Sequence, residues 1–127
     1  MSVKPTTKEL AILKILWEKG PTTVRGVNNI QNLETRVGYT TTLKVMQIMF
    51  EKGFLLRDTS KRSHIYSAKI KEKDTKNGIL GNLMDTVFGG SAHKLVIQAL
   101  GSGKITKEER DKIRAFLDKL EVDEDGN

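Results

Sequence analysis

The chain of 127 residues contains no cysteine and only two histidines. Without cysteine it can form no disulfide, no thiolate metal site and no thiol nucleophile. His64 and His93 lie in different segments with no carboxylate-rich motif around them, so we expect no metal site and no cofactor. No apolar run approaches the roughly 20 residues that cross a bilayer, and the N-terminus lacks the apolar core of a signal peptide. We therefore expect a cytoplasmic protein without membrane insertion.

Catalytic motifs are also missing. Gly101-Ser-Gly-Lys104 has the end of a phosphate-binding loop, but Gln98 stands where the motif requires a glycine and Ile105 where it requires Ser or Thr. The acidic pair Glu108-Glu109 belongs to the first turn of an expected helix, where the helix dipole already favours negative charge. We identify no catalytic residue and expect the protein not to be an enzyme.

Positive charge is present and unevenly distributed. The net charge of the chain is +6; residues 1–70 contain 12 Lys/Arg and 5 Asp/Glu, whereas residues 71–127 contain 10 and 11. The first part therefore carries +7 and the second −1. Neutralised phosphates supply most of the non-specific affinity of proteins for DNA. The asymmetry favours a DNA-binding N-terminal part and a nearly neutral C-terminal part.

The N-terminal part has the pattern of short helices. Thr6-Thr-Lys-Glu9 predicts a capping box that opens a helix ending at Gly20-Pro21, with Trp17 in the core. A second helix, capped by Thr22 or Thr23, should run to about Leu33. Its expected buried stripe consists of Val24, Val27, Ile30 and Leu33.

The third expected helix, over residues 39–52, has two different sides. An apolar stripe contains Val45, Met46, Met49 and Phe50. Polar side chains lie on or near the opposite side, namely Thr40, Thr41, Lys44 and Gln47. Short hydroxyl, amide and ammonium groups suit base edges and phosphates in a major groove. This side is our candidate for DNA recognition.

A basic hairpin should follow this helix. Lys61 and Arg62 would lie at its turn, and Arg57 would be exposed. We expect Leu56 and Ile65, and in one alternative also Leu55, to face the core. Three helices followed by a hairpin is the order of a winged helix-turn-helix, so the predicted fold class is mainly α with a small β-wing.

Residues 71–127 predict three amphipathic helices, which bury too little surface to fold alone. They must cover either residues 1–70, which we call the head, or the same helices of a second chain. The simpler interpretation divides the chain into a winged-helix DNA-binding domain, residues 1–70, and a helical dimerisation segment, residues 71–127. The expected dimer contacts are Leu83, Val87, Leu95, Val96, Ala99, Leu100, Phe116 and Leu117.

Three segments resemble the penicillinase and methicillin-resistance repressors: residues 7–17, residues 38–54 and Phe88-Gly-Gly90. The resemblance implies a homodimeric winged-helix transcriptional repressor that binds a palindromic operator in double-stranded DNA. Position by position, Thr40, Thr41, Leu43 and Lys44 match the DNA-facing part of the family's recognition helix. Lys61 and Arg62 match the wing, and residues 95–100 match the dimer-forming tail.

The resemblance also implies how repression ends. Family members in antibiotic-resistance systems are cut in the tail at an Asn-Phe-like bond, which points to a membrane sensor protease system as a partner. The matching pair here is Gln98-Ala99, a departure from that pattern. The competing interpretation is a helical protein-interaction module, or a winged-helix scaffold without operator-specific repression.

Overall fold

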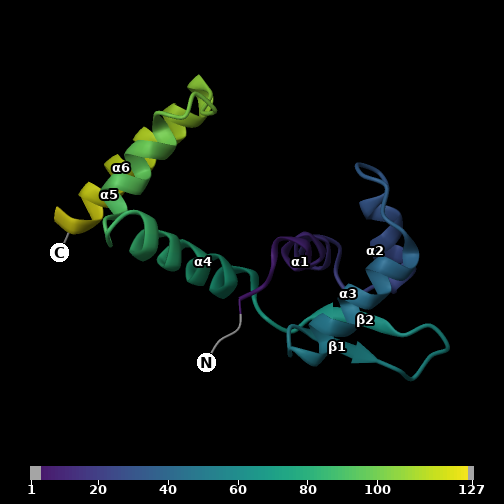
Figure 1. The fold of residues 1–127 in the computed structure, drawn as a ribbon. Helices are drawn as coiled ribbons and strands as arrows, with labels where there is room; N and C mark the ends of the chain where they lie inside the picture. The colour runs from purple at the N-terminus through teal and green to yellow at the C-terminus, as the bar shows by residue number, and fades with distance from the viewer. Residues whose placement is uncertain (1–3, 126–127) are drawn as a thin grey trace. The chain divides into compact units, whose positions relative to one another are not determined.

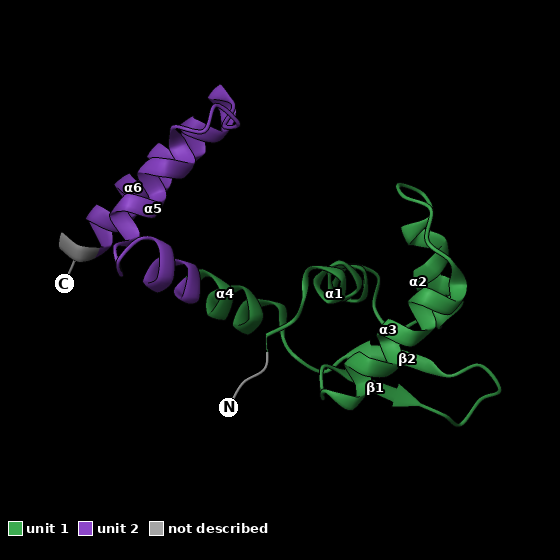
Figure 2. Ribbon diagram, viewed as in Figure 1, with its two compact units in different colours: residues 1–80 green, residues 81–127 purple. Residues whose placement is uncertain are grey.

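The computed structural model describes residues 4–125 and is mainly helical, with one antiparallel hairpin (Figure 1). It divides into two compact units, residues 1–80 and 81–127, coloured separately in Figure 2. The predicted fold class, mainly α with a small β-wing, is confirmed. The described elements are α1 (Thr7–Lys19), α2 (Val24–Gln31), α3 (Tyr39–Glu51), β1 (Leu55–Asp58), β2 (Ile65–Ala68), α4 (Glu72–Val87), α5 (Ala92–Leu100) and α6 (Lys107–Asp125).

Helix α1 begins and ends where the sequence predicts. The Thr6 side chain accepts a hydrogen bond from the Glu9 amide, and the Glu9 carboxylate accepts one from the Thr6 amide, which completes the capping box. Gly20 closes the helix with a φ of 82°, a conformation that glycine adopts without strain. Trp17 packs against the core as expected, and its indole N–H donates to the Ile70 carbonyl at 3.0 Å.

Helix α2 is shorter than predicted. Thr23, one of the two candidate caps, accepts a hydrogen bond from the Gly26 amide, but the helix ends at Gln31. Leu33, expected in the buried stripe, is 83% exposed and lies in the link to α3. The helix stops because the Asn32 side chain donates to the carbonyls of Asn28 and Val37 and turns the chain there.

The hairpin corrects our assignment of its faces. Leu55 is buried, whereas Leu56, expected to face the core, is 52% exposed. The ladder pairs Leu55 with Ala68 and Arg57 with Tyr66, so these four share the inner face, and Ile65 belongs to the outer one. Because successive side chains of a strand point to opposite faces, an error of one residue in the assignment places every side chain on the wrong face. The predicted faces were wrong because the charged residue Arg57 lies on the inner face, where it is half-buried rather than exposed.

An additional backbone pairing extends the sheet. Thr22, between α1 and α2, exchanges two hydrogen bonds with Tyr66, of 3.0 and 2.8 Å. Strand β2 thus has a hydrogen-bonded neighbour on each side, and the hairpin is tied to the helices. A free two-stranded hairpin is only marginally stable in water, so this pairing and the burial of Leu55 and Tyr66 hold the wing in place.

The core of the first unit is formed by one side each of α1, α2 and α3, the turn residue Phe54 and the inner face of the hairpin. Its buried apolar residues are Ile12, Leu13, Leu16, Val24, Val27, Met46, Met49, Phe54, Leu55 and Tyr66. Glu9, 3% exposed, is a buried charge at the edge of this core and forms an ion pair with Lys52 at 2.8 Å. Lys52 caps the end of α3, so the pair links the start of α1 to the end of α3.

The second unit contains the end of α4 with α5 and α6. Ser91 caps α5, and Thr106 with Glu109 forms a capping box at the start of α6. Neither α4 nor α5 contains a buried residue. The boundary predicted after Ile70 stays a prediction; the division between the two units lies within α4, after Leu80.

Candidate nucleic-acid interface

The polar side of α3 is exposed along its length. Thr40, Thr41, Lys44 and Gln47 are all exposed, and we call them the α3 polar face. Leu43, between them, is half-buried and packs against the core. On the other side of the helix, Met46 and Met49 are fully buried. Because this apolar stripe is buried, a large rotation of α3 about its axis would expose it, and the polar face keeps its outward orientation.

A cleft of about 350 Å³ lies beside the α3 polar face. Three elements line it: the start of α2, the outer side of α3, and the hairpin with its loop. The lining residues are Thr23, Val24, Arg25, Tyr39, Leu43, Gln47, Arg57, Arg62, Ser63, His64 and Tyr66. Three of them are arginines and none is a carboxylate. We call this the arginine cleft; it brings Leu43 and Gln47 of the helix together with Arg62 of the wing.

Two of these arginines are held against aromatic rings. The Arg25 guanidinium lies 4.1 Å from the centre of the Tyr39 ring, and that of Arg57 lies 4.0 Å from the centre of the Phe50 ring. Such stacking favours one orientation of a long flexible side chain. It leaves guanidinium N–H groups for hydrogen bonds, the geometry that suits phosphate oxygens, although the Nε of Arg57 is itself buried.

The wing loop has an internal support. The Asp58 carboxylate accepts a hydrogen bond from the Ser60 amide at 2.9 Å, which shapes the turn after β1. This bond, with the nearby charge of Lys61, holds the pKa of Asp58 below its usual value. Lys61 and Arg62 follow and are both exposed. Arg62 lines the arginine cleft, whereas Lys61 and Lys44 do not.

Sequence reasoning missed part of this cleft. Arg25, Tyr39 and His64 were not among the predicted site residues, and Arg57 was assigned to solvent alone. Arg25 could have been identified from the sequence, because it is the second residue of a helix capped by Thr. Its side chain therefore extends from the N-terminal end of that helix. The pairing with Tyr39 depends on how α2 packs on α3, which no local pattern encodes.

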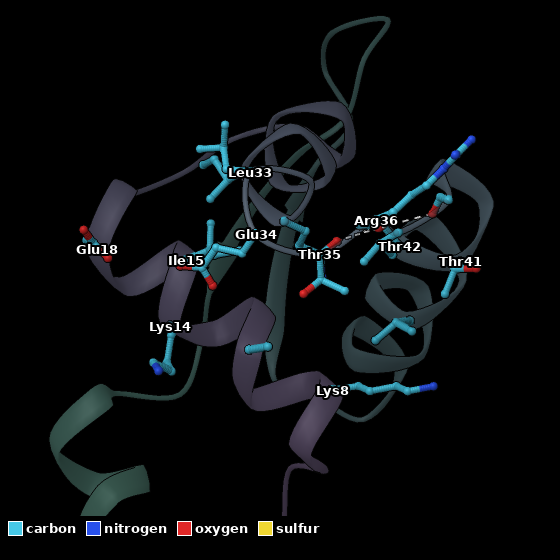
Figure 3. Close-up of a pocket in the computed structure, with 16 residues that line it drawn as sticks. Lys8, Lys14, Ile15, Glu18, Leu33, Glu34, Thr35, Arg36, Thr41 and Thr42 are labelled. Carbon is cyan, nitrogen blue, oxygen red and sulfur yellow. Dashed lines mark hydrogen bonds between the residues drawn. The ribbon is translucent and has the colours of Figure 1, made fainter. Parts of the chain in front are cut away.

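A larger groove of about 700 Å³ lies between α1 and the residues that lead into α3 (Figure 3). Lys8, Lys14 and Glu18 approach it from α1, and Arg36 and Glu34 from the link. Its charges are mixed and its walls are largely aliphatic, so it lacks the uniformly basic lining of the arginine cleft. Thr41 and Thr42 form its edge next to the α3 polar face.

Over residues 4–125, no three His, Cys, Asp or Glu side chains are grouped so that they could hold a metal ion. In the same range, every helix is too short or too polar to cross a membrane.

The residues predicted for dimerisation lie on three helices. Leu83 and Val87 are on α4; Leu95, Val96, Ala99 and Leu100 on α5; Phe116 and Leu117 on α6. Most are exposed, including Val87 at 66% and Phe116 at 60%, and Leu95 is intermediate. Gln98 and Ala99, the pair predicted from the family resemblance as a cleavage position, are exposed in the last turn of α5.

Comparison with known proteins agrees with this geometry. Residues 5–119 match the family described as penicillinase repressor. The match covers both the head and most of the tail. The family is one of DNA-binding transcriptional repressors and not of enzymes. A search of curated proteins gave no match to an individual relative.

Proposed function

We propose, since this chain belongs to the penicillinase repressor family, that it is a homodimer that binds a palindromic operator and blocks transcription from a promoter it overlaps. One observation carries the proposal. A helix anchored by buried methionines presents an exposed polar face beside a cleft lined by three arginines and no carboxylate. That combination fits a groove of DNA, where base edges lie between two rows of phosphates.

The reading step follows from the side chains that α3 exposes. Lys44 can donate to guanine O6 and N7, and Gln47 can make paired hydrogen bonds to adenine. The methyl groups of Thr40 and Thr41, with Leu43, are suited to thymine methyls. These contacts distinguish base pairs, because each pair presents its own pattern of donors, acceptors and methyl groups in the major groove.

The positioning step depends on charge. Lys61 and Arg62 on the wing, with Arg25 and Arg57 in the arginine cleft, would neutralise phosphates on the strands beside the groove. Phosphate contacts fix the register and angle of the protein but carry little sequence information. They would also make affinity fall steeply with salt, since each neutralised phosphate releases condensed counterions.

Exposed apolar side chains on α4, α5 and α6 support a dimer. Val87, Phe116 and Leu117 are each more than half exposed. Exposed apolar side chains in this number are characteristic of protein interfaces, and the charged head is a poor match for them. A second copy of the tail supplies the same apolar faces, so we propose that Leu83, Val87, Leu95, Val96, Ala99, Leu100, Phe116 and Leu117 form the dimer contacts.

Relief of repression would follow from loss of the dimer. We propose that a signal acts on the C-terminal segment, most simply by proteolysis near Gln98-Ala99 by a membrane sensor protease system. The two residues lie in the last helical turn of α5, next to the Gly101-Ser-Gly103 loop. That turn must open before a protease can bind it in an extended form, and helix ends open most readily.

Lys44→Ala tests base reading. The reference duplex is one recovered with the wild-type protein from a random pool, and a scrambled duplex of the same composition is the comparison. If Lys44 reads a base, the variant should lose about 1–3 kcal/mol of binding free energy on the recovered duplex. It should lose little binding free energy on the scrambled duplex. Fluorescence anisotropy at fixed salt measures both affinities.

Two further variants make this result specific. Lys61→Ser should weaken both duplexes alike and lower the salt slope by about one, because it removes a phosphate contact. Lys14→Ala, at an exposed lysine of α1, should leave both affinities unchanged. Base reading by Lys44 is wrong if Lys44→Ala weakens the two duplexes equally, as Lys61→Ser does.

A further inference from the structure

Between α2 and α3 lies a cluster of buried polar side chains that no DNA contact explains. Asn28 of α2 is 5% exposed and Thr42 of α3 is 1% exposed. Buried polar groups lower stability unless they are hydrogen-bonded. Here they bond to one another and to the link between the two helices.

The hydrogen bonds form a continuous chain. One Asn28 amide N–H donates to the Val37 carbonyl at 2.9 Å and the other to the Thr42 hydroxyl at 3.0 Å. The Thr42 hydroxyl in turn donates to Gln31 Oε1 at 2.6 Å. Asn28 and Gln31 lie on α2 and Thr42 lies on α3, so the hydroxyl of Thr42 joins the two helices.

The link between the helices is fastened by the same cluster. Asn32, which caps the end of α2, donates to the Val37 carbonyl at 3.0 Å and accepts from the Val37 amide at 3.0 Å. Val37 is two residues before the start of α3. Both its backbone groups are therefore fixed to α2, and with them the point at which α3 begins.

Thr42 occupies a particular place on α3. It directly follows Thr40 and Thr41 and precedes Leu43 and Lys44, the residues assigned to DNA. Its side chain points inward at the edge of the groove shown in Figure 3, where dashed lines mark its hydrogen bonds to other residues of the groove lining. Apolar packing permits small rotations and slides of one helix on another, whereas a directional hydrogen bond allows few.

We infer that Thr42 is a positioning residue for DNA reading: with Asn28 and Gln31, its hydroxyl fixes the angle at which α3 presents its polar face. The inference rests on the proposed function. Reading a base needs paired hydrogen bonds within a few tenths of an ångström, whereas phosphate attraction tolerates misalignment. Loss of the hydroxyl should therefore reduce discrimination between duplexes more than it reduces general affinity.

Thr42→Val tests this, because valine keeps the shape and removes only the hydroxyl. The probes are the duplex recovered from the random pool and the scrambled duplex of the same composition. On the recovered duplex we expect about a tenfold loss of affinity, the low end for a lost base contact. On the scrambled duplex we expect less than about a twofold loss, since phosphate contacts remain.

Two more variants exclude a general loss of stability. Thr42→Ser restores the hydroxyl and should recover most of the discrimination. Thr75→Val makes the same chemical change in α4, where the hydroxyl bonds only locally, to the carbonyl of Lys71 just before the helix, and should alter neither affinity. All affinities are measured well below the unfolding temperature of each variant.

The outcomes separate this inference from the proposed function. If Lys44→Ala reduces discrimination and Thr42→Val does not, the positioning role is wrong and base reading stands. If Thr42→Val weakens both duplexes equally, or Thr42→Ser fails to restore discrimination, the inference is also overturned. If neither Lys44→Ala nor Thr42→Val alters discrimination, α3 does not read DNA and the proposed function itself fails.

Discussion

Phe116→Asp should convert a dimer into a monomer and weaken binding to the recovered operator about 100-fold or more. Phe116 is 60% exposed on α6, so aspartate at this position should leave the fold of a single chain intact. In a dimer interface the same carboxylate would be buried without a partner, which is strongly unfavourable. The mass should be measured by sedimentation and the affinity by anisotropy.

The size of this effect follows from linking two heads. Once one head of a dimer is bound, the second meets its half-site at a high effective concentration, which raises overall affinity by about 10²–10⁴. A monomer loses that gain while each head stays unchanged. Its affinity for a single half-site should therefore equal that of one wild-type head.

Arg114→Gln is the matched control for this variant. It makes the same change in charge on the opposite side of α6, at an exposed residue paired with Asp111. It should remain a dimer with wild-type affinity. An unchanged mass for Phe116→Asp would contradict the assignment of α6 to the interface, and a monomer with full operator affinity would contradict the need for a dimer.

Glu9→Gln should lower the free energy of unfolding of the head by about 2–3 kcal/mol, a large part of the stability of a small domain. The carboxylate of Glu9 is buried, caps α1 and pairs with Lys52. Glutamine keeps the size and one acceptor but loses the charge. Urea unfolding at neutral pH, followed by circular dichroism, measures the difference.

The same variant should change how stability depends on pH. Burial raises the pKa of the Glu9 carboxyl, but hydrogen bonds from Lys52 and the Thr6 amide and the charge of Lys52 outweigh it, and the pKa lies below its ordinary value of 4.5. Because the pKa is lower in the folded state, the ionised carboxylate stabilises the fold at pH values above 4.5. This stabilisation is lost as the pH falls through the folded-state pKa. Wild type should therefore lose stability more steeply than Glu9→Gln below pH 4.5.

A control separates the ion pair from general acid effects. Asp58 and Glu109 also have lowered pKa values, through hydrogen bonds from Ser60 and Thr106, and they remain in the variant. Glu18→Gln, at an exposed residue of α1, should follow the wild-type pH curve. Parallel curves for wild type and Glu9→Gln would mean that the buried pair adds no pH-dependent stability.

Local signals in the sequence were sufficient for most of the helices. Capping residues located α1, and the apolar period of 3.6 located α3 and separated the α3 polar face from Met46 and Met49. The capping box at Thr6 is formed by hydrogen bonds between residues only three positions apart, so it can be predicted from the sequence. The same holds for Ser91 and Thr106 in the second unit.

The sequence-based predictions failed where contacts between residues far apart in the sequence determine the structure. Leu33 has the helical spacing of a core residue, but Asn32 ends α2 before it through bonds to Val37. Leu56 has the hydrophobicity of an inner residue, but Arg57 takes the inner face because its guanidinium stacks on Phe50. The arginine cleft and the Thr42 cluster both depend on how α2 packs on α3, which a single sequence does not specify.

The central claim is that the polar face of α3 enters the major groove, and site-directed DNA cleavage tests it most directly. Because the chain has no cysteine, Gln47→Cys provides a unique thiol for an iron chelate that cuts nearby DNA. Glu18→Cys on α1 serves as the control position. On the recovered duplex, the reagent at position 47 should cut at two symmetric sites about 10 base pairs apart. Weak, diffuse cutting that is the same from positions 47 and 18 would contradict the account.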